Sequence, residues 1–168
     1  MIITLASSLL SGGVFAQTQF QQNLINDINA LTEQINIGPE TKELYVKRSE
    51  AIFILNATEP EQTWVPFTLV DAINDVNCAL DLHPDDASLY SLRAEYKRDI
   101  YRDREGAVSD MNRAIELDPD NAQWYLQRAN YQNLSNGCFD YILCAAMKDK
   151  RCQEIVLAVC SDMSGREF

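Results

Sequence analysis

Three short phrases of the sequence repeat at a fixed distance from a proline. Each reads Leu or Trp, then Tyr, two further residues, Arg, and Ser or Ala, and each tyrosine follows its proline by six residues. The phrases are 44–49, 89–94 and 124–129, after Pro39, Pro84 and Pro119. The prolines are 45 and then 35 residues apart. Such a period is typical of stacked helical hairpins, each unable to bury its apolar face alone, so we expect an all-α chain.

The spacing of apolar residues predicts where the helices lie. An N-terminal helix is expected at 19–35, and three hairpins follow within repeats at 42–84, 87–119 and 122–148. The third hairpin is expected to turn at Ser135-Asn136-Gly137, and a capping helix is expected at 151–161. Within the first repeat, residues 56–66 contain two prolines and continue neither helix. Trp64 in this insertion is expected either to pack the loop onto its own hairpin or to contact a partner.

The N-terminal residues form a separate segment. Residues 2–15 carry no charge, mix apolar residues with Ser and Gly, and lead to Ala16 before Gln17. This pattern is typical of a cleaved secretory signal, although no Lys or Arg precedes the apolar run. We therefore predict a signal peptide at 1–16 and one domain at 17–168 of an exported protein, periplasmic or secreted. A buried amphiphilic segment is the alternative.

Charge and residue content argue against several functions. The chain has 14 basic and 25 acidic residues, a net charge of −11 that repels nucleic acid and anionic membrane surfaces. The single histidine, His83, abuts Pro84 in an expected turn, and we find no nucleophile motif, phosphate-binding loop or metal motif. We therefore expect no catalysis, no cofactor and no metal.

The hairpins resemble tetratricopeptide repeats over roughly residues 40–148. Ala72, Val76, Ala79 and Leu80 before Pro84 recur as Ala107, Met111, Ala114 and Ile115 before Pro119. The resemblance implies a right-handed α-solenoid of about three hairpins, whose first helices line a concave groove. It also implies which residues face that groove: Glu43, Val46, Glu50, Phe53, Ser91, Glu95, Arg98, Leu126 and Asn130. A groove of mixed apolar and acidic residues suits a basic or amphipathic peptide.

An Arg and an Asp recur at matching positions of the two helices of each hairpin. Arg48 matches Asp75 and Arg93 matches Asp110, with Arg128 and Asp140 as a further case. We expect structural ion pairs within the hairpins, and a row of anion-binding arginines is the alternative.

Four of the five cysteines lie in the last 31 residues. Small exported tetratricopeptide proteins resemble this segment in Gly137-Cys138-Phe139-Asp140 and in a last helix ending at Cys160. Two antiparallel helices turning near residues 148–149 would place Cys138 opposite Cys160 and Cys144 opposite Cys152. We predict these two disulfides, and reduced thiols if the protein is cytosolic. Cys78 is expected to be a free, inert thiol or a link to another chain.

Two functions remain at this point. The first is a noncatalytic interaction module of the cell envelope that binds a protein or peptide in its groove. The second is a self-associating assembly protein that uses Trp64 or Cys78. The first function is compatible with a monomer and the second with a weak homo-oligomer, and we expect one of these two states.

Overall fold

The structure is a computed structural model that describes residues 8–58, 67–132 and 134–160. These residues form eight α-helices and one π-helical segment, η1, with no strand among them. The elements are α1 Ser8–Ile37, α2 Lys42–Thr58, α3 Leu69–Leu82, α4 Ala87–Tyr101, α5 Arg104–Leu117, α6 Ala122–Tyr131, α7 Leu134–Ala146, α8 Lys150–Ile155 and η1 Val156–Cys160. Contacts divide the chain into two compact units, Met1–Leu82 and His83–Phe168.

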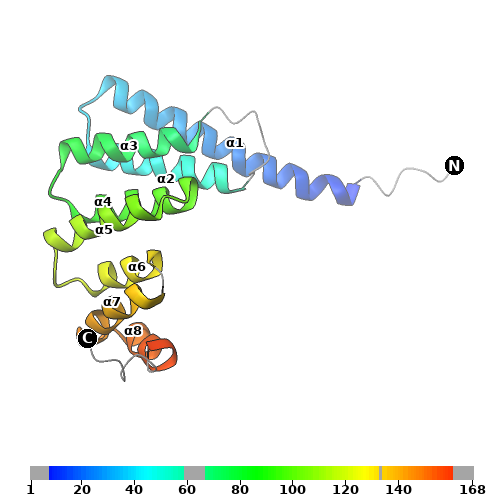
Figure 1. The fold of residues 1–168 in the computed structure, drawn as a ribbon. Helices are drawn as coiled ribbons and strands as arrows, with labels where there is room; N and C mark the ends of the chain where they lie inside the picture. Colours follow the sequence, from blue (N-terminus) through cyan, green and yellow to red (C-terminus); the bar gives the residue numbers. More distant parts are fainter. Residues whose placement is uncertain (1–7, 59–66, 133, 161–168) are drawn as a thin grey trace. The chain divides into compact units, whose positions relative to one another are not determined.

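The first unit is a hairpin of α2 and α3 with α1 packed along α2 (Figure 1). Its core contains Ile28, Ile52 and Val76, each at most 1% exposed. The α1 helix begins at Ser8, which is earlier than the apolar stripe predicted. Asn56 closes the end of α2 by donating from Nδ2 to the Ile52 and Phe67 carbonyl oxygens, at 2.8 and 3.0 Å. Trp64 and residues 1–7 of the predicted signal peptide lie outside the described residues.

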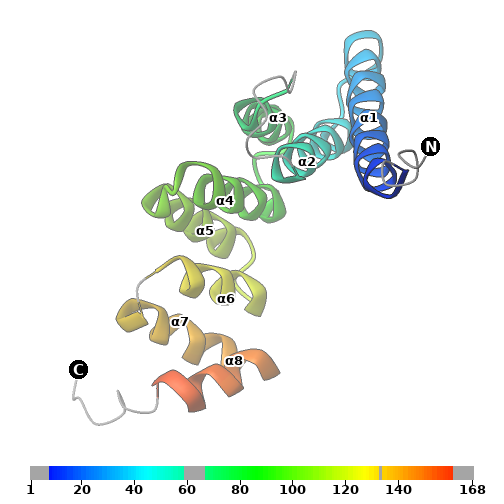
Figure 2. The same ribbon diagram turned by 90° about the vertical axis from the view of Figure 1, so that its right-hand side faces the viewer.

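The second unit contains two hairpins, α4 with α5 and α6 with α7, followed by α8 and η1 against α7 (Figure 2). Short polar residues begin four of its helices, as expected of N-caps: Asp86, Asp103, Asn121 and Asp149 accept hydrogen bonds from backbone N–H groups of the first turn. Between α4 and α5 the chain reverses at Arg102, whose φ of 51° lies in the left-handed region.

The predicted turn of the third hairpin was wrong. The α6 helix ends at Tyr131 and α7 already begins at Leu134, so Ser135-Asn136-Gly137 lies inside α7. Gly137 has a packing role: a Cβ atom there would lie 2.8 Å from the Ala129 carbonyl oxygen. The glycine that looked like a turn residue therefore permits the close approach of α7 to α6.

Two disulfides join α7 to the C-terminal elements and match the predicted pairs. Cys138 bonds to Cys160 and Cys144 to Cys152, with Cα–Cα distances of 5.7 and 5.8 Å. All four cysteines belong to a core cluster that also contains Leu126. Because α8 and η1 have only six and five residues, they bury little surface of their own. The cystines, each worth ~3 kcal/mol by restricting the unfolded chain, hold this cap in place.

Gly137→Ala tests the close approach of the two helices. We expect a loss of about 1–3 kcal/mol in the free energy of unfolding, because the added methyl meets a backbone carbonyl that cannot rotate away. Urea unfolding followed by circular dichroism measures it. Ser109→Ala, at an exposed position of α5, is the control and should change stability by less than about 0.5 kcal/mol. A more stable Gly137→Ala protein would contradict the packing, since alanine otherwise favours a helix.

Candidate functional site

Every hairpin contains the same two-point bridge between its helices. In each, the arginine of the repeated phrase donates from Nε and from one terminal nitrogen to both oxygens of an aspartate on the second helix. The pairs are Arg48–Asp75, Arg93–Asp110 and Arg128–Asp140, with N–O distances of 2.5 to 2.9 Å. The three aspartates are buried, at 4%, 4% and 2% exposed. These hydrogen bonds raise the pKa of each arginine.

The tyrosine of the phrase completes this arrangement. Each guanidinium lies over the ring of the tyrosine three residues before it, 5.5 to 5.9 Å from the ring centroid. In the second unit the hydroxyls of Tyr90 and Tyr125 donate to the Pro84 and Pro119 carbonyl oxygens, at 3.0 and 3.1 Å. The six-residue spacing in the sequence is therefore the distance across which the tyrosine fastens the preceding turn. We call each set of tyrosine, arginine and aspartate a clamp.

The clamps include partners that the sequence did not suggest. Arg48 also donates to the Thr32 hydroxyl of α1, at 3.1 Å, and Arg128 to the Asn112 side-chain oxygen of α5, at 2.7 Å. These contacts attach the first and third clamps to the helix before each hairpin. Lys97 pairs with Asp110 at 2.8 Å, and its position one turn after Arg93 could have indicated it. With their charges satisfied in this way, the arginines are occupied structurally.

Four of the predicted groove residues form one face of α2, which we call the α2 surface. Glu43, Val46, Glu50 and Phe53 follow at steps of three, four and three residues, so they lie on one side of the helix. The two glutamates are exposed, and Val46 and Phe53 are half-buried. This surface combines apolar contact area with two carboxylates.

The remaining groove candidates lie in the second unit, and they differ in accessibility. Ser91 and Leu126 are both 7% exposed; Ser91 donates to the Gln127 side-chain oxygen at 2.7 Å. Glu95 is half-buried, and Asn130 is exposed but accepts from the Tyr141 hydroxyl at 2.7 Å. Arg98 stacks on the Tyr131 ring at 4.9 Å. The side chains of Ser91 and Leu126 thus contribute to packing and offer little surface to a ligand.

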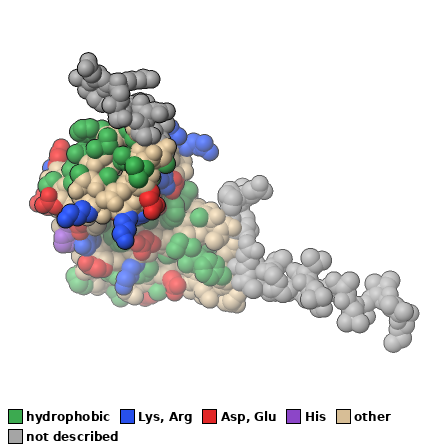
Figure 3. All heavy atoms as spheres, turned by 90° about the horizontal axis from the view of Figure 1, so that it is seen from below, with side chains coloured by type: hydrophobic (Ala, Val, Ile, Leu, Met, Phe, Trp, Pro, Cys, Tyr) green, Lys and Arg blue, Asp and Glu red, His purple; other side chains and the backbone are tan. Residues whose placement is uncertain are grey.

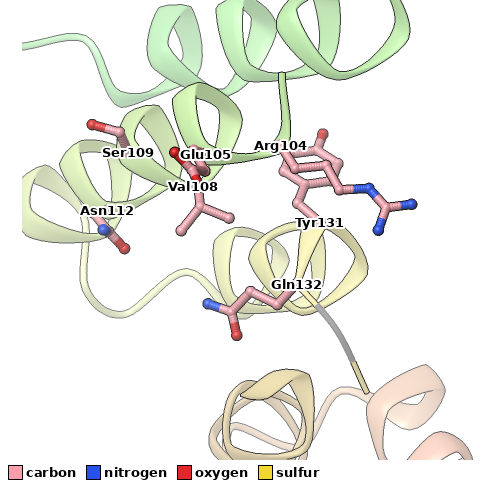
Figure 4. A pocket seen from close by; sticks show the side chains of 7 residues that line it. All are labelled: Arg104, Glu105, Val108, Ser109, Asn112, Tyr131 and Gln132. Carbon is pink, nitrogen blue, oxygen red and sulfur yellow. The ribbon is translucent and has the colours of Figure 1, made fainter. Parts of the chain in front are cut away.

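A shallow pocket of about 530 Å³ opens between α5 and the end of α6. Figure 4 shows Val108 and Ser109 of α5 on one side and Tyr131 and Gln132 on the other. Arg104, Glu105 and Asn112 complete its lining. No sequence pattern indicated this pocket, since its residues come from two repeats. Its lining holds one acid and one base and no nucleophile–base pair that would indicate catalysis.

The cysteine and acidic side chains in the described part of the chain form no metal site with free thiolates. Cys144, Asp149 and Cys152 are the one cluster of potential metal ligands found there, and both sulfurs are committed to a disulfide. Cys78 is a free, half-buried thiol, and burial, together with Asp75 and Asp81, raises its pKa. A raised pKa keeps this thiol protonated and weakly nucleophilic.

No helix among the described residues is long and apolar enough to cross a membrane. No protein-family model matches the sequence, and no curated protein matches it.

Solved structures do resemble the chain. Two crystal structures of MamA, a tetratricopeptide-repeat protein, superpose with TM-scores of 0.60 and 0.60 at 14% identity; they cover 79% and 75% of this chain, and 68% and 69% of MamA. The first tetratricopeptide-repeat domain of Spaghetti (RPAP3), bound to the HSP90 peptide SRMEEVD, superposes with a TM-score of 0.58 at 15% identity. It covers 74% of this chain and 94% of that domain. The chain has the tetratricopeptide-repeat fold.

The tetratricopeptide-repeat fold confirms the predicted all-helical class and the stacked hairpins. At such low identity the resemblance shows the fold alone. Which residues bind a ligand, and which ligand they bind, follows only from this chain's own side chains.

Tyr90→Phe and Tyr125→Phe test whether the tyrosine hydroxyls fasten the turns. Each change removes one hydrogen bond to a proline carbonyl and should lower the free energy of unfolding by about 0.5–1.5 kcal/mol. Tyr101→Phe, an exposed tyrosine at the end of α4, serves as the control and should have no measurable effect. Equal stabilities of all three variants would show that the six-residue spacing has another origin.

Proposed function

We propose that the protein is a noncatalytic interaction module of the cell envelope that binds a basic or amphipathic peptide segment. The observation that carries the proposal is the α2 surface, where exposed Glu43 and Glu50 alternate with half-buried Val46 and Phe53. A peptide with apolar and cationic side chains at matching intervals would bury its apolar groups there and pair its cations with the carboxylates.

The charge of the first unit supports a cationic ligand. Residues 1–82 contain ten acidic and three basic side chains, which gives this unit −7 of the chain's net −11. Arg48, one of the three bases, is engaged by Asp75. Such a charge raises the rate at which a cationic segment meets the α2 surface.

The peptide bound by Spaghetti (RPAP3), SRMEEVD, has three acidic residues and one basic residue. On the α2 surface its carboxylates would meet Glu43 and Glu50. Repulsion between these carboxylates and the two glutamates disfavours an acidic peptide. We therefore propose that this chain binds a more basic class of peptide than that neighbour does.

An exported location is part of the proposal. Two disulfides in the C-terminal cap suit an oxidising compartment, where cystines form and persist. The predicted signal peptide at 1–16 supports the same location. Self-association through Cys78 has less support, because this thiol is half-buried and its pKa is raised, which disfavours the thiolate.

A charge reversal on α2 tests the proposed ligand. Fluorescence anisotropy would follow a labelled 18-residue helical peptide of Leu and Lys binding to the wild type and to Glu43→Lys/Glu50→Lys. We expect the double variant to bind at least about tenfold more weakly, since two attractive contacts become repulsive.

Asp27→Lys/Glu33→Lys is the matched control, because it makes the same change in net charge at exposed positions of α1. This control should bind within about twofold of the wild type at 0.15 M salt, where charges far from the ligand are screened. Equal losses in both double variants would reduce the interaction to net charge and overturn the α2 surface as the site.

A further inference from the structure

The outer face of the third hairpin differs from those of the first two. The bridging aspartates align the second helices, so the residues one before, two after and six after each aspartate are equivalent. These residues are Asn74, Asn77 and Asp81 in α3; Ser109, Asn112 and Glu116 in α5; and Phe139, Ile142 and Ala146 in α7. In α7 alone the three positions are apolar, yet Phe139 is 65% and Ile142 50% exposed.

A residue from the C-terminal cap extends this apolar area. The Gln153 side chain donates to the Ala145 carbonyl oxygen at 3.4 Å, which aligns this edge of α8 with α7. Because the two elements are antiparallel, this alignment places Leu157, four residues after Gln153, about one turn nearer the start of α7, at about the level of Ile142. Leu157 is 77% exposed. We call Phe139, Ile142, Ala146 and Leu157 the α7 patch.

The α7 patch is held on a rigid support. Cys138 immediately precedes Phe139 and is bonded to Cys160, and Cys144 follows Ile142 by two residues and is bonded to Cys152. The exposed side chains therefore keep a fixed spacing, so that a ligand does not have to order them on binding. Figure 3 shows hydrophobic side chains gathered on the nearer part of the molecule, with charged side chains of both signs around them.

The charges at one end of the α7 patch are basic. Lys148, in the turn that follows Ala146, and Lys150, the first residue of α8, are both exposed. Asp149 between them is directed inward: it caps α8 and pairs with Arg151 at 2.7 Å, and chiefly this contact lowers its pKa to about 2. The turn and the start of α8 thus present two cations outward near the apolar side chains.

We propose that the α7 patch is a docking site for a short amphipathic helix of another protein, whose apolar stripe covers Phe139, Ile142 and Leu157 and whose acidic residues meet Lys148 and Lys150. The patch is on the order of a few hundred Å², whereas a stable dimer buries about 800 Å² on each partner. A second copy is further disfavoured because two chains of charge −11 repel each other, as does an anionic membrane. This site is separate from the α2 surface and takes a ligand of opposite charge.

The test replaces the patch with the polar residues of the second hairpin. The variant Phe139→Ser/Ile142→Asn gives α7 the serine and asparagine that α5 has at the equivalent positions, Ser109 and Asn112. Folding should therefore be preserved. The probe is an 18-residue helical peptide of Leu and Glu, titrated into the full ¹⁵N-labelled chain. We expect shifts confined to α7, the turn that follows it, α8 and η1. The variant should bind the peptide at least about tenfold more weakly.

Two further variants separate the contributions. Lys148→Glu/Lys150→Glu should weaken the peptide about three- to tenfold, by reversing the charge at the end of the patch. Val70→Ser/Leu82→Asn, which removes exposed apolar side chains from the first unit, is the matched control and should bind like the wild type. Binding of the Leu and Lys peptide to the α2 surface should be unchanged in Phe139→Ser/Ile142→Asn, so the two sites succeed or fail independently.

Three outcomes overturn the proposal. One is the absence of peptide-induced shifts on α7 and η1. Another is a concentration-dependent dimer, seen in sedimentation equilibrium, that Phe139→Ser/Ile142→Asn abolishes, because the occupant would then be a second copy. The third is flotation with phosphatidylcholine vesicles that the same variant abolishes, because the patch would then bind lipid.

Discussion

The two-point bridge between an arginine and a buried aspartate is the contact on which the rest of this structure depends. In Arg48–Asp75, Arg93–Asp110 and Arg128–Asp140 it fixes how the second helix of a hairpin lies against the first. A buried carboxylate is costly without a counter-charge, so sliding one helix by a residue would leave both groups unpaired. The bridge therefore specifies register, and the small buried residues that follow each arginine, Ser49, Ala94 and Ala129, allow the helices to approach.

Register is also what connects the fold to its surfaces. Because every hairpin is aligned by the same bridge, a side chain on one hairpin can be compared directly with its equivalents on the others. The comparison shows an acidic and apolar face on α2 and an apolar face on α7 where α3 and α5 are polar. We propose that the first of these faces binds a basic ligand and the second an acidic one.

The sequence predicted those features that repeat and missed those that depend on a single contact. The hairpins and the Arg–Asp pairs followed from repeated spacing, since helix geometry converts residue intervals into faces. The disulfides followed from the antiparallel arrangement of the last two helices and, for Cys138–Cys160, from the family resemblance as well. The contacts of the tyrosines were not predicted. Gly137 was misread because a glycine that terminates a helix and a glycine that admits a neighbouring backbone look alike in one sequence. The burial of Ser91 depends on Gln127 in the next repeat, and the pocket beside Tyr131 joins two repeats, so neither has a local signal.

A double-mutant cycle on Arg128 and Asp140 tests the role of the bridge most directly. Arg128→Met, Asp140→Leu and the double variant would be compared with the wild type by urea unfolding. We predict that Asp140→Leu alone costs about 3 kcal/mol, because it leaves a half-buried guanidinium without its carboxylate. The double variant should recover much of that loss, giving a coupling energy of about 2 kcal/mol or more. Losses that add to within about 0.5 kcal/mol would contradict the account.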